Sequence, residues 1–206
     1  MRTEVIRDND LSFAVEVLKS GELVGVPTDN VYGLAANGLD AKAVARIYEV
    51  RGHPEVEQLC LLVPNILVAA TVWAGIPKSA HLLAEVFWPG PLTIVLPRRD
   101  TVPYIVTAGS HTVGVRCPDN HKILKLLRLA NLPAVAPPAI TSEMYSPMSA
   151  EEVLAHYDGQ LHCIIDDGRC KKVAEPTVVS LTTQPYKILK QGSIPEERIQ
   201  HVLGLT

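Results

Sequence analysis

The chain has 206 residues, of which 47% are hydrophobic, 20% charged and 5% aromatic, and its formal net charge is −3 at pH 7. This composition excludes an intrinsically disordered chain, and the length suits one domain over residues 1–206 with a core of about residues 10–204. Because the weak negative charge provides no global basic field, contact with a nucleic acid would require a local basic patch.

Helical and strand patterns alternate along the whole chain. Apolar residues at helical spacing predict helices, two of them with an aspartate, Asp10 or Asp40, as N-cap. Short apolar runs predict buried strands. In chain order we expect helix 11–20, strand 23–26, helix 40–50, strand 59–63, helix 78–87, strands 92–96 and 112–116, helix 121–130, strand 134–136, helix 150–156, strands 163–166, 177–181 and 187–189, and helix 195–203. The alternation predicts an α/β fold, and the strand-rich last third predicts a mixed sheet.

Other features predict a cytoplasmic protein. No apolar run approaches the roughly 18 residues of a membrane-spanning helix, and the first ten residues lack the apolar stretch of a secretory signal. The four cysteines are widely spaced in mostly apolar stretches, so we expect reduced core thiols. No Cys or His pair has zinc spacing, which predicts no metal site of that kind.

Polar side chains follow the first predicted strand, in the segment 26–34. Thr28, Asp29 and Tyr32 come directly after the strand ends. Because ligands of α/β sheets bind at the carboxyl ends of the strands, this segment is a candidate binding turn. An ordinary polar turn is the alternative.

Basic residues at the ends of other elements are candidates for binding an anion. Arg51 and His53 follow the C-terminal end of the second predicted helix. They could bind an anion there, or Arg51 could instead interact favourably with the helix dipole. Arg116 closes an apolar strand and, because a buried unpaired charge is costly, needs either a carboxylate ligand or an internal aspartate. Thr177 and Lys190 lie at strand ends, where they would face the same cleft or be solvated. The segment 87–93 is expected to be a rigid apolar corner.

In this order the segments resemble the YrdC-like family over roughly residues 10–204. The resemblance is carried by residues 27–29, 32–34, 88–93, 106–109, 113–119, 164–168 and 177–179. It implies a twisted mixed sheet flanked by helices around a large, concave, positively lined cleft. It also implies an L-threonylcarbamoyladenylate synthase, which condenses L-threonine with bicarbonate and transfers the product to the α-phosphate of ATP in the presence of Mg²⁺. The product serves modification of tRNA together with other tRNA-modification proteins.

The same resemblance implies roles for particular residues. Arg116 would bind the carboxylate of threonine, and the rest of the threonine pocket would comprise Thr28, Asn30, Tyr32 and Thr177. Arg51, His53 and Lys190 would bind the nucleotide phosphates, and Arg51, His53 and Arg116 would be catalytic. Catalysis would then depend on positioning and charge neutralisation rather than on a covalent nucleophile.

Several positions depart from the family pattern. Glu57 replaces a lysine, Pro176 replaces a serine, and a Ser-x-Asn stretch is replaced by residues 138–140. The family further has threonine, lysine, arginine and arginine where this chain has Asn30, Arg51, His53 and Lys190.

One alternative is a catalytically degenerate homologue that binds nucleotide or double-stranded RNA. Its basic patch would comprise Lys122, Lys125, Arg128, Lys171 and Lys172, which otherwise form a solvated surface. A carbamoyl-transfer domain with another acceptor is a third possibility.

Overall fold

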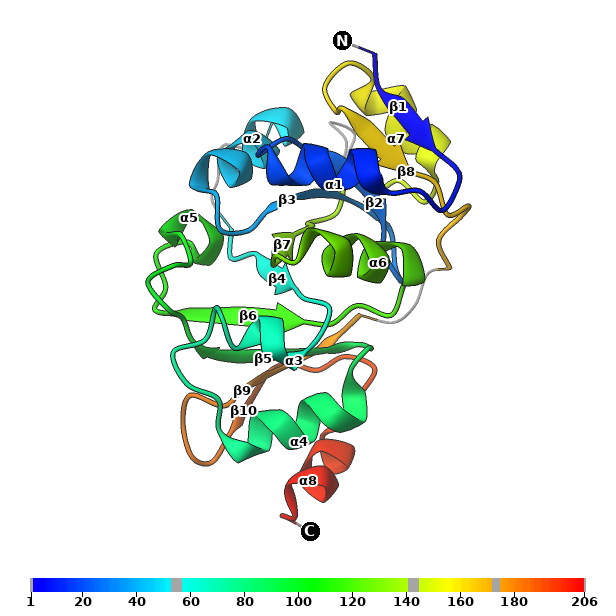
Figure 1. The fold of residues 1–206 in the computed structure, drawn as a ribbon. Helices are drawn as coiled ribbons and strands as arrows, with labels where there is room; N and C mark the ends of the chain where they lie inside the picture. Colours follow the sequence, from blue (N-terminus) through cyan, green and yellow to red (C-terminus); the bar gives the residue numbers. More distant parts are fainter. Residues whose placement is uncertain (1, 53–56, 141–144, 172–174, 206) are drawn as a thin grey trace.

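The computed structural model describes residues 2–52, 57–140, 145–171 and 175–205 (Figure 1). The helices are α1 (Ser12–Lys19), α2 (Ala41–Arg51), α3 (Ile66–Ala69), α4 (Lys78–Phe87), α5 (Tyr104–Thr107), α6 (His121–Ala130), α7 (Ala150–Tyr157) and α8 (Glu196–Leu203). The strands are β1 (Glu4–Ile6), β2 (Val24–Pro27), β3 (Tyr32–Asn37), β4 (Cys60–Leu62), β5 (Leu92–Pro97), β6 (Thr112–Arg116), β7 (Ala134–Val135), β8 (Cys163–Ile165), β9 (Thr177–Ser180) and β10 (Lys187–Lys190).

The ten strands of the described residues form one sheet in the order β1-β8-β2-β3-β7-β4-β6-β5-β9-β10. Parallel pairs such as β4 with β6 and β5 with β9 lie beside antiparallel pairs such as β2 with β3. The sheet is therefore mixed, which confirms the predicted α/β fold class. Mixed pairing is found along the whole sheet, not only in the last third of the chain.

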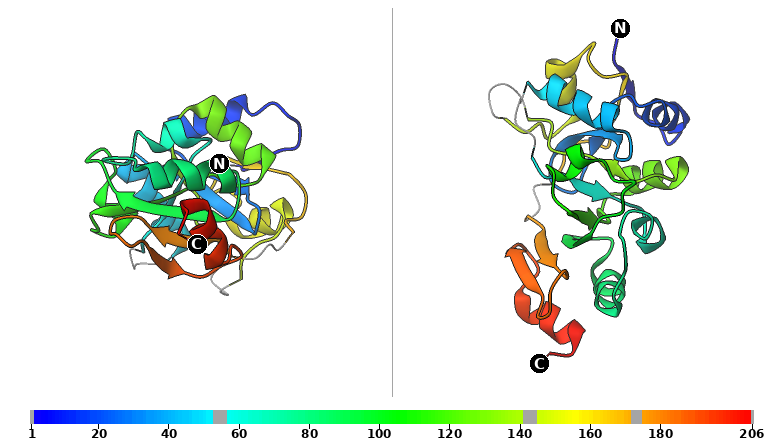
Figure 2. Two further views of the ribbon diagram at one scale, coloured as in Figure 1. Left: turned by 90° about the horizontal axis from the view of Figure 1, so that it is seen from below. Right: turned by 90° about the vertical axis from the view of Figure 1, so that its left-hand side faces the viewer.

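Helices cover the sheet in separate groups, and each group buries its own core. Figure 2 shows α1 and α6 side by side on one side of the sheet, where Leu18 and Leu127 are fully buried together with Ile165 of β8. A larger core lies between α2, α4, α7 and α8 and the sheet, includes Ile164 of the same strand β8, and contains Trp73. Fully burying a large apolar side chain contributes about 1.5–3 kcal/mol, so these cores supply the main driving force of folding.

The predicted helices and strands are all confirmed, with differences of one or two residues at their ends. Asp40 caps α2 by accepting from the N–H groups of Lys42 and Ala43, as expected. The prediction for Asp10 was wrong: Leu11 occupies the N-cap position of α1 without a side-chain cap, and Asp10 instead accepts from the N–H of Ser12 at 3.0 Å. The sequence patterns missed β1, β3, α3 and α5.

Two further observations concern the cysteines and the helix lengths of the described residues. All four cysteines are free thiols, with Cys117 and Cys163 buried and Cys60 and Cys170 partly exposed. In the part of the chain that the structure describes, no helix is both long and apolar enough to cross a bilayer.

Candidate functional site

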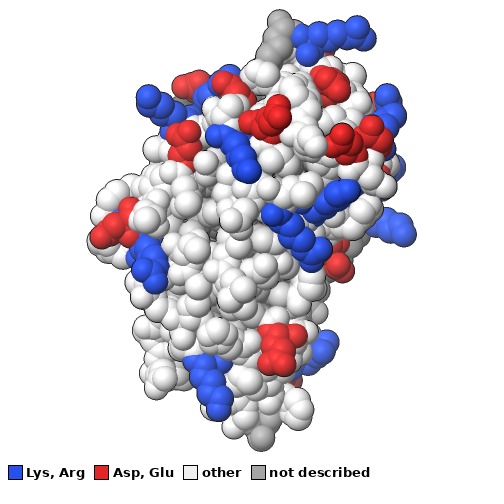
Figure 3. Space-filling view, viewed as in Figure 1, with Lys and Arg blue, Asp and Glu red and all other residues white. Residues whose placement is uncertain are grey.

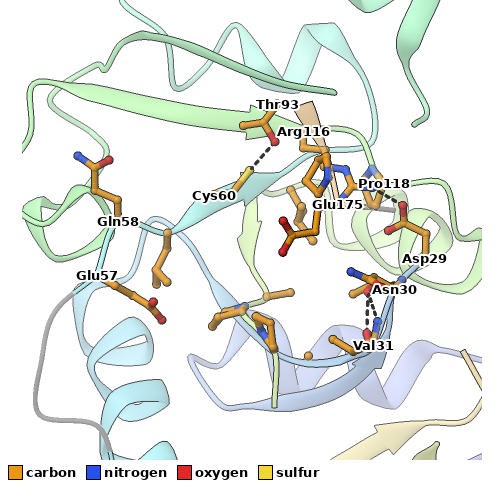
Figure 4. A pocket seen from close by; sticks show the side chains of 18 residues that line it. Asp29, Asn30, Val31, Glu57, Gln58, Cys60, Thr93, Arg116, Pro118 and Glu175 are labelled. Atoms are coloured by element: carbon orange, nitrogen blue, oxygen red, sulfur yellow. Dashed lines mark hydrogen bonds and ion pairs between the residues drawn. The ribbon is translucent and has the colours of Figure 1, made fainter. Parts of the chain in front are cut away.

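One cavity of about 300 Å³ lies where the turn after β2 faces β4, β5 and β6 (Figure 4). Its walls also include the segment after β7 and the segment before β9, so residues distant in the sequence meet here. The described lining residues are Thr28, Asp29, Asn30, Val31, Gly33, Glu57, Gln58, Leu59, Cys60, Leu62, Thr93, Arg116, Pro118, Ala136, Pro137, Pro138, Glu175 and Pro176.

The turn at residues 28–31 is held by the hydroxyl of Thr28. This hydroxyl donates to the carbonyl of Val31 at 2.6 Å and accepts from the N–H groups of Asn30 and Val31 at 3.2 and 3.3 Å. A threonine after the strand therefore fixes the turn by local hydrogen bonds, as Ser and Thr side chains commonly do. This conformation places Asp29 and Asn30 at the cavity wall.

Arg116 is the guanidinium of the cavity, and its partner is an internal carboxylate. It forms an ion pair with Asp29, and the two side chains are 12% and 10% exposed, respectively. Its Nε also donates to the carbonyl of Gly90 at 3.0 Å. Of the two partners left open by the sequence, the structure contains the internal aspartate. Pairing satisfies a charge that would otherwise be costly to bury.

The corner at residues 87–93 positions Arg116 as well as shaping the core. Trp88 stacks on Trp73 with ring centroids 6.1 Å apart, and its indole N–H donates to Leu92 O at 2.7 Å. A Cβ on Gly90 would lie 2.5 Å from the carbonyl oxygen of Phe87, so only glycine fits this backbone. The predicted structural role is confirmed, and the contact of Gly90 with Arg116 connects it to the cavity.

Arg51 reaches the cavity only through a carboxylate. Its side chain is 4% exposed and donates to Glu57 Oε1 at 2.7 Å, while Glu57 is 53% exposed and lines the cavity. Nε of Arg51 has no hydrogen-bond partner among the described residues. His53, the second predicted basic residue of this segment, lies outside the described residues.

Lys190 is also paired with a carboxylate that lines the cavity. Its Nζ lies 2.7 Å from Glu175 Oε2, and Glu175 rather than Lys190 is among the lining residues. The described lining thus contains the carboxylates of Asp29, Glu57 and Glu175 and the guanidinium of Arg116. The expected positive lining was wrong for the described residues, because acidic side chains stand between the cavity and two of its nearby cations.

Tyr32 and Thr177 are both fully buried, so neither lies on the cavity surface. The hydroxyl of Tyr32 donates to Gly168 O at 2.9 Å and accepts from the N–H of Asp167 at 3.1 Å, and burial raises its pKa. The hydroxyl of Thr177 donates to Ile194 O at 2.8 Å and accepts from the N–H groups of Gly192 and Ile194. Both residues lie behind the lining of the cavity and hold neighbouring segments by these hydrogen bonds.

The remaining wall follows β7 and packs against β3. Leu34 N–H donates to Pro137 O at 3.0 Å, and Ala139 N–H donates to Tyr32 O at 2.9 Å. A Cβ on Gly33 would lie 2.9 Å from the carbonyl oxygens of Ala136 and Pro137, so glycine permits this close approach. Pro138 lines the cavity, whereas Ile140 is not among its described lining residues.

Some lining residues carried no signal in the sequence. Cys60 and Thr93 come from the middle of the sheet, with their Sγ and Oγ1 atoms 4.0 Å apart, and burial raises the pKa of Cys60 to about 11. Strand alternation places them on the cavity face, but this face is known only once the sheet order is known.

Two lysines of the proposed basic patch are hydrogen-bonded to the N-terminal segment of the chain. Lys122 is 5% exposed, and its Nζ donates to Asp8 O at 2.6 Å and to Asn9 Oδ1 at 3.1 Å. Lys125 donates to Asn9 O at 2.7 Å, and Lys172 lies outside the described residues. Figure 3 shows acidic and basic side chains interspersed on the face that carries α1 and α6. In the described residues the α6 lysines therefore hold the N-terminal segment rather than form a free basic surface.

Fold and cavity together define an α/β domain with a cavity that carries charged side chains over the middle of a mixed sheet. Within the described residues, no group of three or more His, Cys, Asp or Glu side chains is placed to hold a metal ion. The Sua5/YciO/YrdC family profile, described as "Telomere recombination", matches residues 16–192. The chain belongs to this family.

Named relatives extend the comparison. The chain is 40% identical over 201 residues to the threonylcarbamoyl-AMP synthase of Pyrococcus abyssi and 37% identical over 205 residues to that of Bacillus subtilis. Both alignments cover 98% of this chain but 59% of the relative, so the chain spans little more than half of their length.

Solved structures agree with this assignment. The structure of P. abyssi Sua5 complexed with L-threonine matches with a TM-score of 0.88 and 38% identity, covering 99% of this chain and 61% of that one. Escherichia coli YciO matches with a TM-score of 0.79 at 22% identity, which supports the fold alone.

Proposed function

We propose that this domain binds L-threonine and makes threonylcarbamoyl-adenylate from L-threonine, bicarbonate and ATP. The observation that carries the proposal is the match over 99% of the chain to a relative solved with L-threonine, together with a cavity lined by Thr28, Asn30 and Arg116. The product would serve tRNA modification in the cytoplasm with further tRNA-modification proteins.

The first step of the reaction calls for a carboxylate-binding group, which this cavity provides. Arg116 would bind the carboxylate of threonine through its planar fork of N–H donors. The amine of threonine would then form a C–N bond with the carbon of bicarbonate, losing water. A carbamate oxygen would attack the α-phosphorus of ATP and release pyrophosphate. Mg²⁺ would enter with ATP as part of the substrate.

Neutralising the phosphates would fall to Arg51, His53 and Lys190. Arg51 and Lys190 form ion pairs with Glu57 and Glu175, respectively. Each carboxylate must therefore turn away before its cation can contact a phosphate directly. Tyr32 and Thr177 would support the threonine pocket from behind its walls. The electrostatic demand of the reaction is large, because negative charge develops around the α-phosphorus and on the departing pyrophosphate.

A second candidate is supported by the same acidic lining. With three carboxylates and one guanidinium among the described lining residues, a polyphosphate would meet like charge. A catalytically degenerate homologue, which keeps ligand binding without making the adenylate, fits this observation. Binding of double-stranded RNA by such a homologue gains no support from Lys122 and Lys125, which are bonded to residues 8–9.

The deciding experiment is pyrophosphate release from ATP and Mg²⁺, with and without L-threonine and bicarbonate. The synthase is expected to release pyrophosphate only with all substrates present. Arg116→Gln should lower kcat/KM for threonine by at least about tenfold, since a charged hydrogen bond contributes roughly 1.5–3 kcal/mol. Arg128→Gln, an exposed arginine on α6, is the control. Absence of threonine-dependent pyrophosphate at millimolar ATP would leave the degenerate homologue.

A further inference from the structure

Glu152, on the first turn of α7, accepts hydrogen bonds from three donors outside its own helix. Its Oε2 accepts from the N–H of Met148 at 2.7 Å and from the hydroxyl of Tyr145 at 2.6 Å. Its Oε1 accepts from Arg169 Nη1 at 2.7 Å. The N–H of Met148, followed by the other donors, lowers the pKa of Glu152 to about 2, so this side chain is ionised at neutral pH. A single carboxylate therefore connects segment 145–148 to Arg169.

Segment 145–148 contacts the residue that directly follows the turn at the cavity wall. Pro147 O accepts from the N–H of Tyr32 at 2.8 Å. The carbonyl of Tyr32 accepts from the N–H of Ala139 at 2.9 Å. The start of β3 is therefore held between two segments of the chain, and Glu152 anchors one of them.

Cys170, the residue after Arg169, provides a second connection to the same turn. Its N–H donates to Met148 O at 2.7 Å, and its thiol donates to Thr28 O at 3.2 Å. Burial raises the pKa of this thiol, which therefore keeps the proton that it donates. The hydroxyl of Thr28 holds the turn that carries Asp29 at the cavity wall. Both residues that contact the carboxylate side of Cys170, along the chain and through space, are thus tied to the cavity.

We infer that Glu152 is a positioning residue: by anchoring segment 145–148 and Arg169, its carboxylate holds the turn at residues 28–31 in the conformation that lines the cavity. The inference rests on the proposed function, in which this turn contributes to the substrate pocket. It adds a residue that is not itself among the described lining residues. An ionised acceptor forms hydrogen bonds roughly twice as strong as a neutral one. Without it, the turn keeps its local hydrogen bonds through Thr28 but loses a common anchor.

Amide hydrogen exchange followed by NMR tests this without reference to activity. In Glu152→Ala, the N–H groups of Val31 and Tyr32 should exchange at least about tenfold faster than in wild type, because local opening of the turn becomes easier. The amide of Leu127, in the core of α6, should change by less than about threefold. Glu151→Ala removes the neighbouring acidic residue of the same helical turn and is the matched control, in which all three amides should stay within about twofold of wild type.

Steady-state kinetics separates positioning from a general loss of structure. Glu152→Ala should raise KM for L-threonine by at least about fivefold and change kcat by less than about twofold, because the turn carries none of the proposed catalytic groups. Glu152→Asp keeps the charge and should recover part of the loss. Cys170→Ala should also raise KM, whereas Cys170→Ser keeps a donor to Thr28 O and should leave KM within about twofold of wild type.

The outcomes separate this inference from the proposed synthase. Exchange that rises equally in the turn and in α6 would show a merely structural role and overturn the inference, as would unchanged exchange at Val31 and Tyr32 or an unchanged KM. If Glu152→Ala does not fold, the difference in exchange between Cys170→Ala and Cys170→Ser decides in its place. Faster exchange confined to the turn, in a protein whose wild type releases no pyrophosphate, supports the inference and refutes the synthase. Pyrophosphate release by wild type, with exchange and KM unchanged in Glu152→Ala, does the reverse.

Discussion

Replacing Thr177 by valine tests whether the hydroxyl of Thr177 stabilises the fold or binds the ligand. Valine keeps the shape of threonine, so the change removes three hydrogen bonds without opening a cavity: one to Ile194 O at 2.8 Å and two from the N–H groups of Gly192 and Ile194 at 3.0 and 3.1 Å. At about 1 kcal/mol for each, the free energy of unfolding should fall by about 3 kcal/mol. For a chain of this length Tm should fall by about 6–12 °C.

Thermal and urea denaturation followed by circular dichroism measure this loss. Thr101→Val, at an exposed threonine whose hydroxyl lies 3.5 Å from its acceptor, is the control and should change stability by less than about 0.5 kcal/mol. Below its transition, Thr177→Val should bind L-threonine within about threefold of wild type, because the hydroxyl does not face the cavity. A variant with wild-type Tm that no longer binds threonine would refute this reasoning and restore the direct role predicted from the sequence.

Three further predictions concern the walls of the cavity. Glu57→Gln should strengthen binding of tripolyphosphate by roughly two- to fivefold in titrations at low salt, since it removes a half-exposed counter-ion from Arg51; weaker binding would contradict the arrangement. Gly192→Ala should cost about 2–4 kcal/mol of stability and weaken threonine binding, because its Cβ would overlap the backbone of residues 175–177, whereas Gly75→Ala, with nothing within 4 Å, should be neutral. Burial raises the pKa of Cys60 to about 11, so iodoacetamide should alkylate this thiol slowly at pH 8 and faster at each step up to pH 11, as followed by mass spectrometry. An alkylation rate that levels off below pH 9 would show that burial does not suppress the thiolate.

Helices and strands whose apolar residues recur at a regular spacing could be predicted from the sequence, whereas β3 could not. The run Tyr32–Asn37 lacks β-branched residues and contains glycine and alanines, which fit helix or loop equally well. Its strand conformation follows from pairing with β2 on one side and β7 on the other. Tertiary context therefore decided this element, as it often does for strands.

The sequence was enough to predict which residues belong near the candidate site, but not which of their side chains contact one another. Arg116 was expected to need an acidic partner, yet choosing between a ligand and Asp29 required knowing that residues 87 positions apart meet. Tyr32 lies in the right motif, but its hydroxyl is used by Gly168 from another strand end. Such contacts depend on the order of strands in the sheet, which the sequence pattern does not contain.

The long separation between Asp29 and Arg116 has a consequence for how this domain folds. The cavity closes only when the turn after β2, the end of β6 and the segment before β9 have all met, which are contacts of high sequence separation. Because chain entropy must be lost before such contacts form, their assembly is slow relative to that of local helices. Ligand binding should therefore appear only late in refolding, and a bound amino acid should stabilise the finished fold by mass action while leaving partly folded chains unaffected.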